Sequence, residues 1–100
     1  MTEVGAGGIV FEGFEPSKRF EKQYKKLSAV MQQRADDALA DLLLDPRPPG
    51  LGFEKYQGRN NPAIYTIRIN GGYRISLEVV DGNVAFLRKI GTHDQVTRSP

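Results

Sequence analysis

Two arginines on neighbouring predicted strands, Arg68 and Arg74, are the side chains with the clearest chemical potential in this chain. A guanidinium group is planar and permanently charged, and its fork of N–H donors can hold two oxygens of one phosphate. Two such groups brought together would make a site for a phosphodiester. The alternative is that both are ordinary solvated cations of a strand surface.

The hydrophobic pattern predicts that these arginines are neighbours. Apolar and polar residues alternate strictly over 73–79. In the preceding run, Tyr65, Ile67 and Ile69 lie on one face, and Thr66 and Arg68 lie on the other. Joining the apolar faces requires a three-residue loop, Asn70-Gly71-Gly72, with Ile69 opposite Tyr73. In that register Arg68 and Arg74 face each other across the strands, with Cβ atoms roughly 5 Å apart. Like charges so placed either hold an anion between them or splay into water.

His93 is the only histidine. Imidazole titrates near neutrality and can therefore give or take a proton in a reaction. Acid–base chemistry on a bound phosphate needs charge stabilisation at phosphorus, a base and an acid. Two arginines and a histidine would supply charge and a proton donor or acceptor, although a histidine after a turn is also an ordinary surface residue.

A second hairpin adds cations to the same strand face. With an Asp81-Gly82 two-residue loop, Lys89 lies beside Arg74, and with a three-residue loop Arg88 lies there instead, beside Ser76. Both registers remain open. Lys55 and Arg59 either extend this patch toward an RNA backbone or serve only solubility.

The elements that must position these residues can be traced along the chain. The run 9–14 predicts a first strand, and Pro16 with the potential cap Ser17 predicts the start of a helix. Ser28 is a potential cap of a second helix, which Asp45-Pro46 ends. The apolar positions recur at helical spacing: Phe20, Tyr24 and Leu27 in the first helix, and Met31, Ala35, Ala38, Leu39, Leu42 and Leu43 in the second.

This pattern predicts an α+β fold. A two-helix hairpin packs on one face of an antiparallel-rich sheet of four or five strands, in the order β-α-α-β-β-β, and the other sheet face is left open. One hundred residues fit a single domain. We expect it to span 8–97, with tails at 1–7 and 98–100.

Composition narrows the class of protein. Residues 1–46 carry six Lys and Arg against eight Asp and Glu, a net charge of −2, whereas residues 47–100 carry eight against four, a net charge of +4. The basic excess therefore lies on the sheet half. The absence of cysteine fits a reducing cytoplasm. No apolar run reaches the roughly 18–20 residues that span a bilayer, and the N-terminal residues lack the pattern of a signal peptide.

The order of elements and a set of short motifs resemble the RelE/ParE superfamily of type II toxin–antitoxin toxins, above all the RelE-like mRNA interferases. The strongest motifs are Gly72-Tyr73-Arg74-Ile75 and, about twenty residues later, Gly91-x-His93-x-x-Val96. Further segments are Phe20…Lys26-Leu27, Leu42…Asp45-Pro46-Arg47-Pro48, Lys55…Gly58, Tyr65-Thr66-Ile67-Arg68-Ile69 and Asp81-Gly82.

The resemblance implies a ribonuclease that cuts mRNA on the ribosome without metal or other cofactor, and a partner antitoxin that blocks it. It implies that Arg74 holds the scissile phosphate and that Arg68 occupies a cationic position where a lysine commonly transfers protons. His93 would protonate the leaving 5′-oxygen. Contact with ribosomal RNA is a further implied interaction, and no membrane is involved.

The chain departs from the family pattern at one place. The motif usually ends in Val-Tyr, whose aromatic ring contacts the substrate base, whereas this chain has Val96-Thr97. Arginine at 68 is also a poor general base. Two alternatives therefore stand beside the interferase: a ParE-like poison of DNA gyrase without ribonuclease chemistry, and a weakened homologue that only binds its antitoxin.

Overall fold

The structure, a computed structural model, describes residues 9–60, 62–70 and 72–100, without the side chains of 58–60. Its elements follow the predicted order, with two short helices in addition, one before the second strand and one at the end. They are β1 (Gly13–Pro16), α1 (Lys18–Lys25), α2 (Ala29–Leu42), the 3₁₀ helix η2 (Pro49–Leu51), β2 (Glu54–Asn60), β3 (Ala63–Asn70), β4 (Tyr73–Val80), β5 (Val84–Thr92) and α3 (His93–Arg98). The predicted tail 1–7 lies outside the described residues.

Serine caps start both long helices as predicted. The Ser17 hydroxyl accepts a hydrogen bond from the Phe20 amide at 3.0 Å, and the Ser28 hydroxyl accepts one from the Met31 amide at 3.1 Å. Each bond satisfies an amide that has no partner within its own helix. The helical hairpin is thus specified locally by its caps and its apolar stripes.

The sheet has the strand order β1-β5-β4-β3-β2, and its pairs are antiparallel except β1 with β5. The α+β prediction is confirmed, but the first strand lies at Gly13–Pro16 instead of 9–14. A four-residue edge strand takes its position from its parallel partner β5, since Gly13 aligns with Val84, and its own pattern is too short to fix it.

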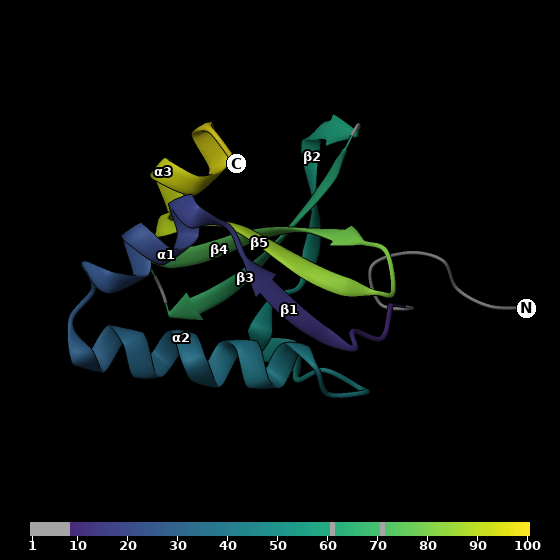
Figure 1. The fold of residues 1–100 in the computed structure, drawn as a ribbon, viewed down its shortest axis with the longest axis horizontal. Helices are drawn as coiled ribbons and strands as arrows, with labels where there is room; N and C mark the ends of the chain where they lie inside the picture. Colours follow the sequence, from purple (N-terminus) through teal and green to yellow (C-terminus); the bar gives the residue numbers. More distant parts are fainter. Residues whose placement is uncertain (1–8, 61, 71) are drawn as a thin grey trace, which may run out of the picture.

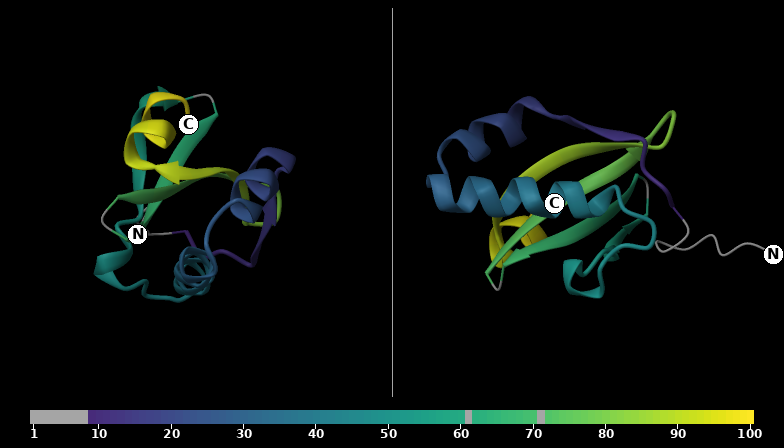
Figure 2. Two further views of the ribbon diagram at one scale, coloured as in Figure 1. Left: turned by 90° about the vertical axis from the view of Figure 1, so that its left-hand side faces the viewer. Right: turned by 90° about the horizontal axis from the view of Figure 1, so that it is seen from below.

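The main core lies between the helical hairpin and one sheet face. One cluster of buried side chains joins the two layers. The helices contribute Phe20, Ala35, Ala38, Leu39 and Leu42, the strands contribute Ile67, Ile75, Leu77, Ala85, Leu87 and Ile90, and Phe11 and Leu51 join from outside the strands. Figure 1 shows α2 running beneath the sheet, and the end-on view in Figure 2 shows the same two layers. Burial of this apolar surface is the main favourable term holding the layers together.

The β3–β4 hairpin confirms one pairing and corrects another. Arg68 stands directly opposite Arg74, as predicted. The pairing of Ile69 with Tyr73 is wrong, because Asn70 pairs with Tyr73 and the register shifts between Arg68 and Asn70. Ile69 is therefore an extra residue in β3, a β-bulge that shortens the loop. Gly71 of the predicted loop lies outside the described residues.

The β4–β5 hairpin combines features of both predicted registers. Val80 pairs with Val84, so the loop has three residues, and Gly82 and Asn83 take positive φ there. Further along, Ser76 pairs with Lys89 while Leu77 pairs with Leu87. Arg88 is the extra residue of a second bulge. The residue opposite Arg74 is consequently Gly91, so the predicted pairings of Lys89 with Arg74 and of Arg88 with Ser76 are both wrong.

The second sheet face is not wholly open. α3 packs across β4 and β5 on the side opposite α2, as Figure 1 shows, and it buries Val96. The prediction of an uncovered face is wrong for the area beneath this helix. Pro100, placed in the predicted C-terminal tail, is buried, and its main-chain oxygen accepts hydrogen bonds from Ser76 and Arg88. Within the described ranges, no helix is long and apolar enough to cross a membrane.

Candidate active site

A hollow of about 490 Å³ lies on the sheet face that carries α3. One wall is β2, which contributes Glu54 and Tyr56, and the opposite wall is α3, which contributes His93 and Thr97. Thr66 and Arg74 of the two middle strands form the floor. In Figure 1, β2 and α3 rise on the same side of the sheet with the strands beneath them.

Arg74 is the cation at the floor of this hollow. Its side chain is only 15% exposed, and its Nη1 lies 3.7 Å from the Glu54 carboxylate and 3.4 Å from the Thr66 hydroxyl, to which it donates. These two contacts orient the guanidinium. Gly91, opposite Arg74 in β5, carries no side chain to cover it. Low exposure raises the strength of any charge interaction that this group makes.

Glu54 is a site residue that the sequence analysis did not identify. Glu54 of β2 pairs with Thr66 of β3, and this pairing brings the Glu54 carboxylate to Arg74 on β4. The carboxylate is 65% exposed and can reach a ligand in the hollow. β2 lacks the regular alternation that would have revealed its register, and its pairing with β3 is irregular beyond Lys55. Only the structure places this acid.

His93 occupies the first position of α3. Thr92 caps the helix in a capping box with Gln95, and the His93 amide donates to the carbonyl of Gly72 at 2.8 Å. These bonds fix the backbone at the mouth of the hollow. The imidazole is 54% exposed, with Nδ1 at 3.4 Å from a carboxylate oxygen of Asp94. The imidazole of His93 is among the groups that line the hollow.

Tyr56 joins the two walls of the hollow. Its hydroxyl donates to the main-chain oxygen of Thr97 at 2.8 Å, across 41 residues of sequence. Thr97 in turn donates from Oγ1 to the carbonyl of His93 at 2.7 Å. The ring of Tyr56 is therefore held beside the position where α3 has a threonine. Tyr56 was not identified from the sequence either.

Arg68 does not share the hollow with Arg74. Its guanidinium packs against Gly52, where a Cβ atom would lie 3.5 Å from Cζ, and it lines a different hollow with Asp37 and Asp41 of α2. Gly52 has a φ of 64° and ends η2. The backbones of the two arginines are thus paired across neighbouring strands, but their side chains line different hollows.

The four predicted RNA-binding residues lie in different places. Lys55 is exposed and lines the hollow beside Glu54. Arg59 belongs to β2, and its side chain is not among those described. Arg88 forms a 2.7 Å ion pair with Glu78, and Lys89 donates to the Ser99 hydroxyl at 3.1 Å. Arg88 and Lys89 line a separate hollow beside Ser17 and Pro100.

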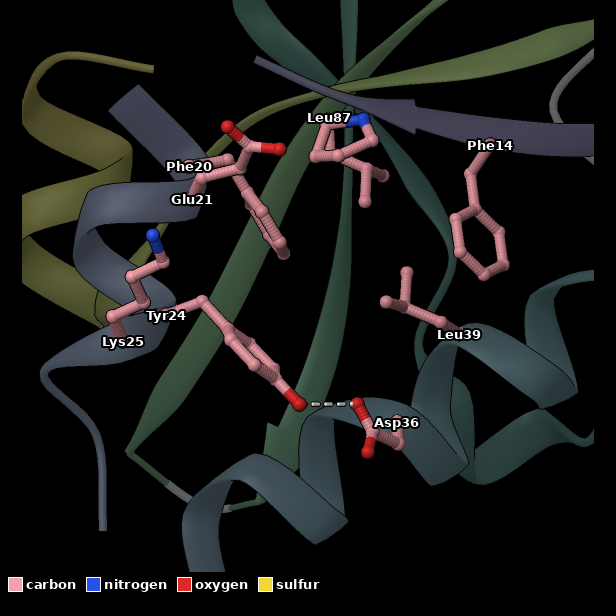
Figure 3. Close-up of a pocket in the computed structure, with 9 residues that line it drawn as sticks. Phe14, Phe20, Glu21, Tyr24, Lys25, Asp36, Leu39 and Leu87 are labelled. Carbon is pink, nitrogen blue, oxygen red and sulfur yellow. Dashed lines mark hydrogen bonds between the residues drawn. The ribbon is translucent and has the colours of Figure 1, made fainter. Parts of the chain in front are cut away.

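A largely apolar groove of about 360 Å³ lies on the other layer of the molecule. Figure 3 shows Phe20 and Tyr24 of α1, Leu39 of α2 and Phe14 of β1 around it, with Leu87 of β5 behind them. The Tyr24 hydroxyl donates to Asp36 at 2.8 Å, and this bond raises the pKa of Tyr24. Phe14 is 43% exposed although it is a large apolar side chain.

Solved structures with the same arrangement of elements identify the fold. RelE in the RelB–RelE antitoxin–toxin complex from Methanococcus jannaschii matches with a TM-score of 0.62 and 23% identity, over 85% of this chain and 96% of the matched chain. The archaeal RelE–RelB complex from Pyrococcus horikoshii OT3 matches with a TM-score of 0.63 and 19% identity, over 84% and 96%. A mutant of the E. coli toxin RelE in the free state matches with a TM-score of 0.63 and 24% identity, over 90% and 88%.

The chain has the RelE fold. No family model matches the sequence, and no curated protein matches it. The resemblance seen in the sequence is confirmed at the level of the fold, since the matched structures are RelE toxins. On this RelE fold, Arg74, His93 and Glu54 meet in one hollow. Among the described side chains, no group of three or more His, Cys, Asp or Glu is arranged to hold a metal ion.

Proposed function

We propose that this protein is the toxin of a type II toxin–antitoxin system and cleaves mRNA on the ribosome. The observation that carries the proposal is the meeting of a guanidinium, a carboxylate and an imidazole around one hollow, contributed by Arg74, Glu54 and His93. Three chemically different groups of this kind are what cleavage by 2′-hydroxyl attack requires.

The proposed reaction assigns one role to each group. The Glu54 carboxylate takes the proton of the 2′-hydroxyl, and the oxygen so formed attacks the adjacent phosphorus. His93 in its protonated form gives a proton to the leaving 5′-oxygen as the P–O bond breaks. Arg74 binds the phosphate oxygens, where negative charge increases in the transition state. The products are a 2′,3′-cyclic phosphate and a free 5′-hydroxyl.

Arg74 fits the electrostatic role better than Arg68 does. Thr66 and Glu54 orient the Arg74 guanidinium, and its side chain is largely buried. A group that is already oriented needs no reorganisation when charge develops, and loss of one such donor typically lowers kcat by about 10²–10³-fold. Arg68 lies against Gly52 outside the hollow, so the proposal gives it no part in the chemistry.

An antitoxin is the second part of the proposal. Two of the matched structures are complexes of RelE with RelB. We place the corresponding partner of this chain in the apolar groove that Figure 3 shows, because exposed aromatic surface such as Phe14 favours a protein ligand. An amphipathic helix with apolar residues at spacings of three and four would fit such a groove.

Cleavage in a cell-free translation reaction tests the proposed activity. We expect the protein to cut the translated mRNA, leaving 5′-hydroxyl ends that primer extension maps to codons. Arg74→Ala should lower the cleavage rate by about 10²-fold or more. Arg68→Ala is the matched control, because it removes the same charge from the opposite strand position, and it should retain nearly the parent rate.

Two outcomes would contradict the proposal. One is intact mRNA in the presence of folded parent protein, and the other is undiminished cleavage by Arg74→Ala. Expression in cells separates the gyrase alternative, since a gyrase poison causes DNA damage and filamentation while protein synthesis continues. Selective loss of amino-acid incorporation is the result that we expect.

A further inference from the structure

The hollow lacks an aromatic ring on α3, and a different element supplies one. The six residues of α3 are HDQVTR, and none of them is Phe, Tyr or Trp. Among the described residues that line the hollow, the only such ring is Tyr56 of β2. We infer that Tyr56 is the residue on which a base of the bound RNA stacks, so that β2 supplies the stacking surface in this protein. The inference rests on the hollow being the RNA site proposed above.

The position of Tyr56 suits this role. It follows Glu54 by two residues on the same strand, and both side chains line the hollow. Glu54 lies 3.7 Å from Arg74, which binds the phosphate in the proposed reaction. A nucleotide whose phosphate is at Arg74 therefore has its base within reach of the wall that carries the ring.

The ring is also held in place before RNA binds. Its hydroxyl donates to the Thr97 oxygen at 2.8 Å, which fixes one end of the side chain against α3. The ring is half-buried, so one part of its surface remains available to the hollow. Stacking on a fixed ring contributes about ten- to a hundred-fold in affinity per base and tolerates any base, because every base has a π-face.

A fluorescent RNA that cannot be cleaved tests the inference separately from catalysis. The probe is a single-stranded RNA trinucleotide with 2-aminopurine beside the scissile phosphate and a 2′-deoxyribose in place of the attacking hydroxyl. Stacking of 2-aminopurine on Tyr56 should quench its emission. Tyr56→Phe keeps the ring and should retain the quenching, whereas Tyr56→Leu should lose it and bind about ten-fold or more weakly.

A second variant uses the absence of tryptophan from this chain. Tyr56→Trp introduces a single indole, and unlabelled RNA of the same sequence should quench its emission. Tyr24→Trp is the matched control, since Tyr24 lies in the groove of the other layer, and its emission should not respond. This arm reports stacking directly even if Tyr56→Leu does not fold.

Several results would overturn the inference. One is that the parent protein does not quench 2-aminopurine, and another is that Tyr56→Leu quenches it as strongly as the parent. A third is that Tyr56→Phe and Tyr56→Leu lose equal amounts of quenching and affinity. The last is that the emission of Tyr56→Trp does not respond to RNA. Equal losses would mean that the hydroxyl acts by anchoring α3. If quenching depends on the ring but the protein cuts no RNA, the inference holds and the proposed activity fails. If the protein cuts RNA but Tyr56→Leu quenches as strongly as the parent, the activity holds and the inference fails.

Discussion

The two arginines show how far a residue pattern reaches. Alternation and the constraint of matching apolar faces predicted that Arg68 and Arg74 stand opposite each other, and the strand pairing confirms it. The direction of each long side chain depends on neighbours from distant segments. Gly52 leaves room for one guanidinium, and Glu54 attracts the other. Of the two outcomes open to such a pair, the structure has the side chains splayed.

Replacing Glu54 tests its role as the base. Glu54→Gln keeps the shape of the side chain but cannot take a proton, so we expect the rate of RNA cleavage to fall by about 10²–10⁴-fold, the usual range for loss of a general base. Binding of RNA should persist or tighten, because a negative charge beside the phosphate is removed. Single-turnover cleavage and equilibrium binding measure the two effects.

Asp81→Asn is the matched control for that experiment. It makes the same chemical change at an exposed residue of the turn between β4 and β5, outside the hollow. Its cleavage rate should equal that of the parent. Glu54→Gln with undiminished cleavage would remove Glu54 from the mechanism.

At the scale of elements, local signals predicted more than long-range ones. The serine caps, both helical stripes and the order of the strands up to β5 could be predicted because each depends on residues close together in sequence. The two bulges could not, because one extra residue in a strand leaves the alternation on either side intact. α3 was missed although Thr92 and Gln95 have the spacing of a capping box.

The start of α3 depends on the missing side chain of Gly91. A Cβ atom there would lie 2.6 Å from Oε1 of Gln95, the atom that accepts the Thr92 amide in the capping box. Gly91→Ala should therefore displace the Gln95 side chain and lower the free energy of unfolding by about 1 kcal/mol, the usual cost of a lost cap. Urea denaturation of the variant measures this cost.

A double substitution shows whether that mechanism is right. Gln95→Ala removes both the cap and the clash, so adding Gly91→Ala to it should cost little more. The sum of the two single losses in unfolding free energy should then exceed the loss in the double variant, as expected for residues that act through one contact. Additive losses would mean that Gly91 acts through something other than Gln95.

At the scale of the whole molecule, the proposed RNA site and the proposed antitoxin groove lie in different layers. The polar hollow lies on the α3 side of the sheet. The apolar groove lies between the helical hairpin and β1 (Figure 3). A partner that filled only the groove would leave Arg74 accessible. An antitoxin that both binds the groove and inhibits must extend around an edge of the sheet or displace α3.

This separation predicts that binding and activity can be lost independently. Phe14→Asp places a charge in the groove at a residue that is 43% exposed, so the fold should tolerate it, while the antitoxin should bind at least about ten-fold more weakly. The variant should still cleave mRNA at the parent rate. Arg74→Ala should behave in the opposite way, with lost cleavage and unchanged capture of the antitoxin.

Co-expression with the proposed antitoxin, followed by affinity purification and a cleavage assay, measures both properties in each variant. Glu15→Lys is a useful control, since it changes the charge at an exposed residue of β1 that does not line the groove. If Phe14→Asp retained full antitoxin binding, the partner would have to dock elsewhere, and the face that carries α3 and Arg74 would become the surface to test. Loss of cleavage in Phe14→Asp without loss of folding would show instead that the two layers are coupled.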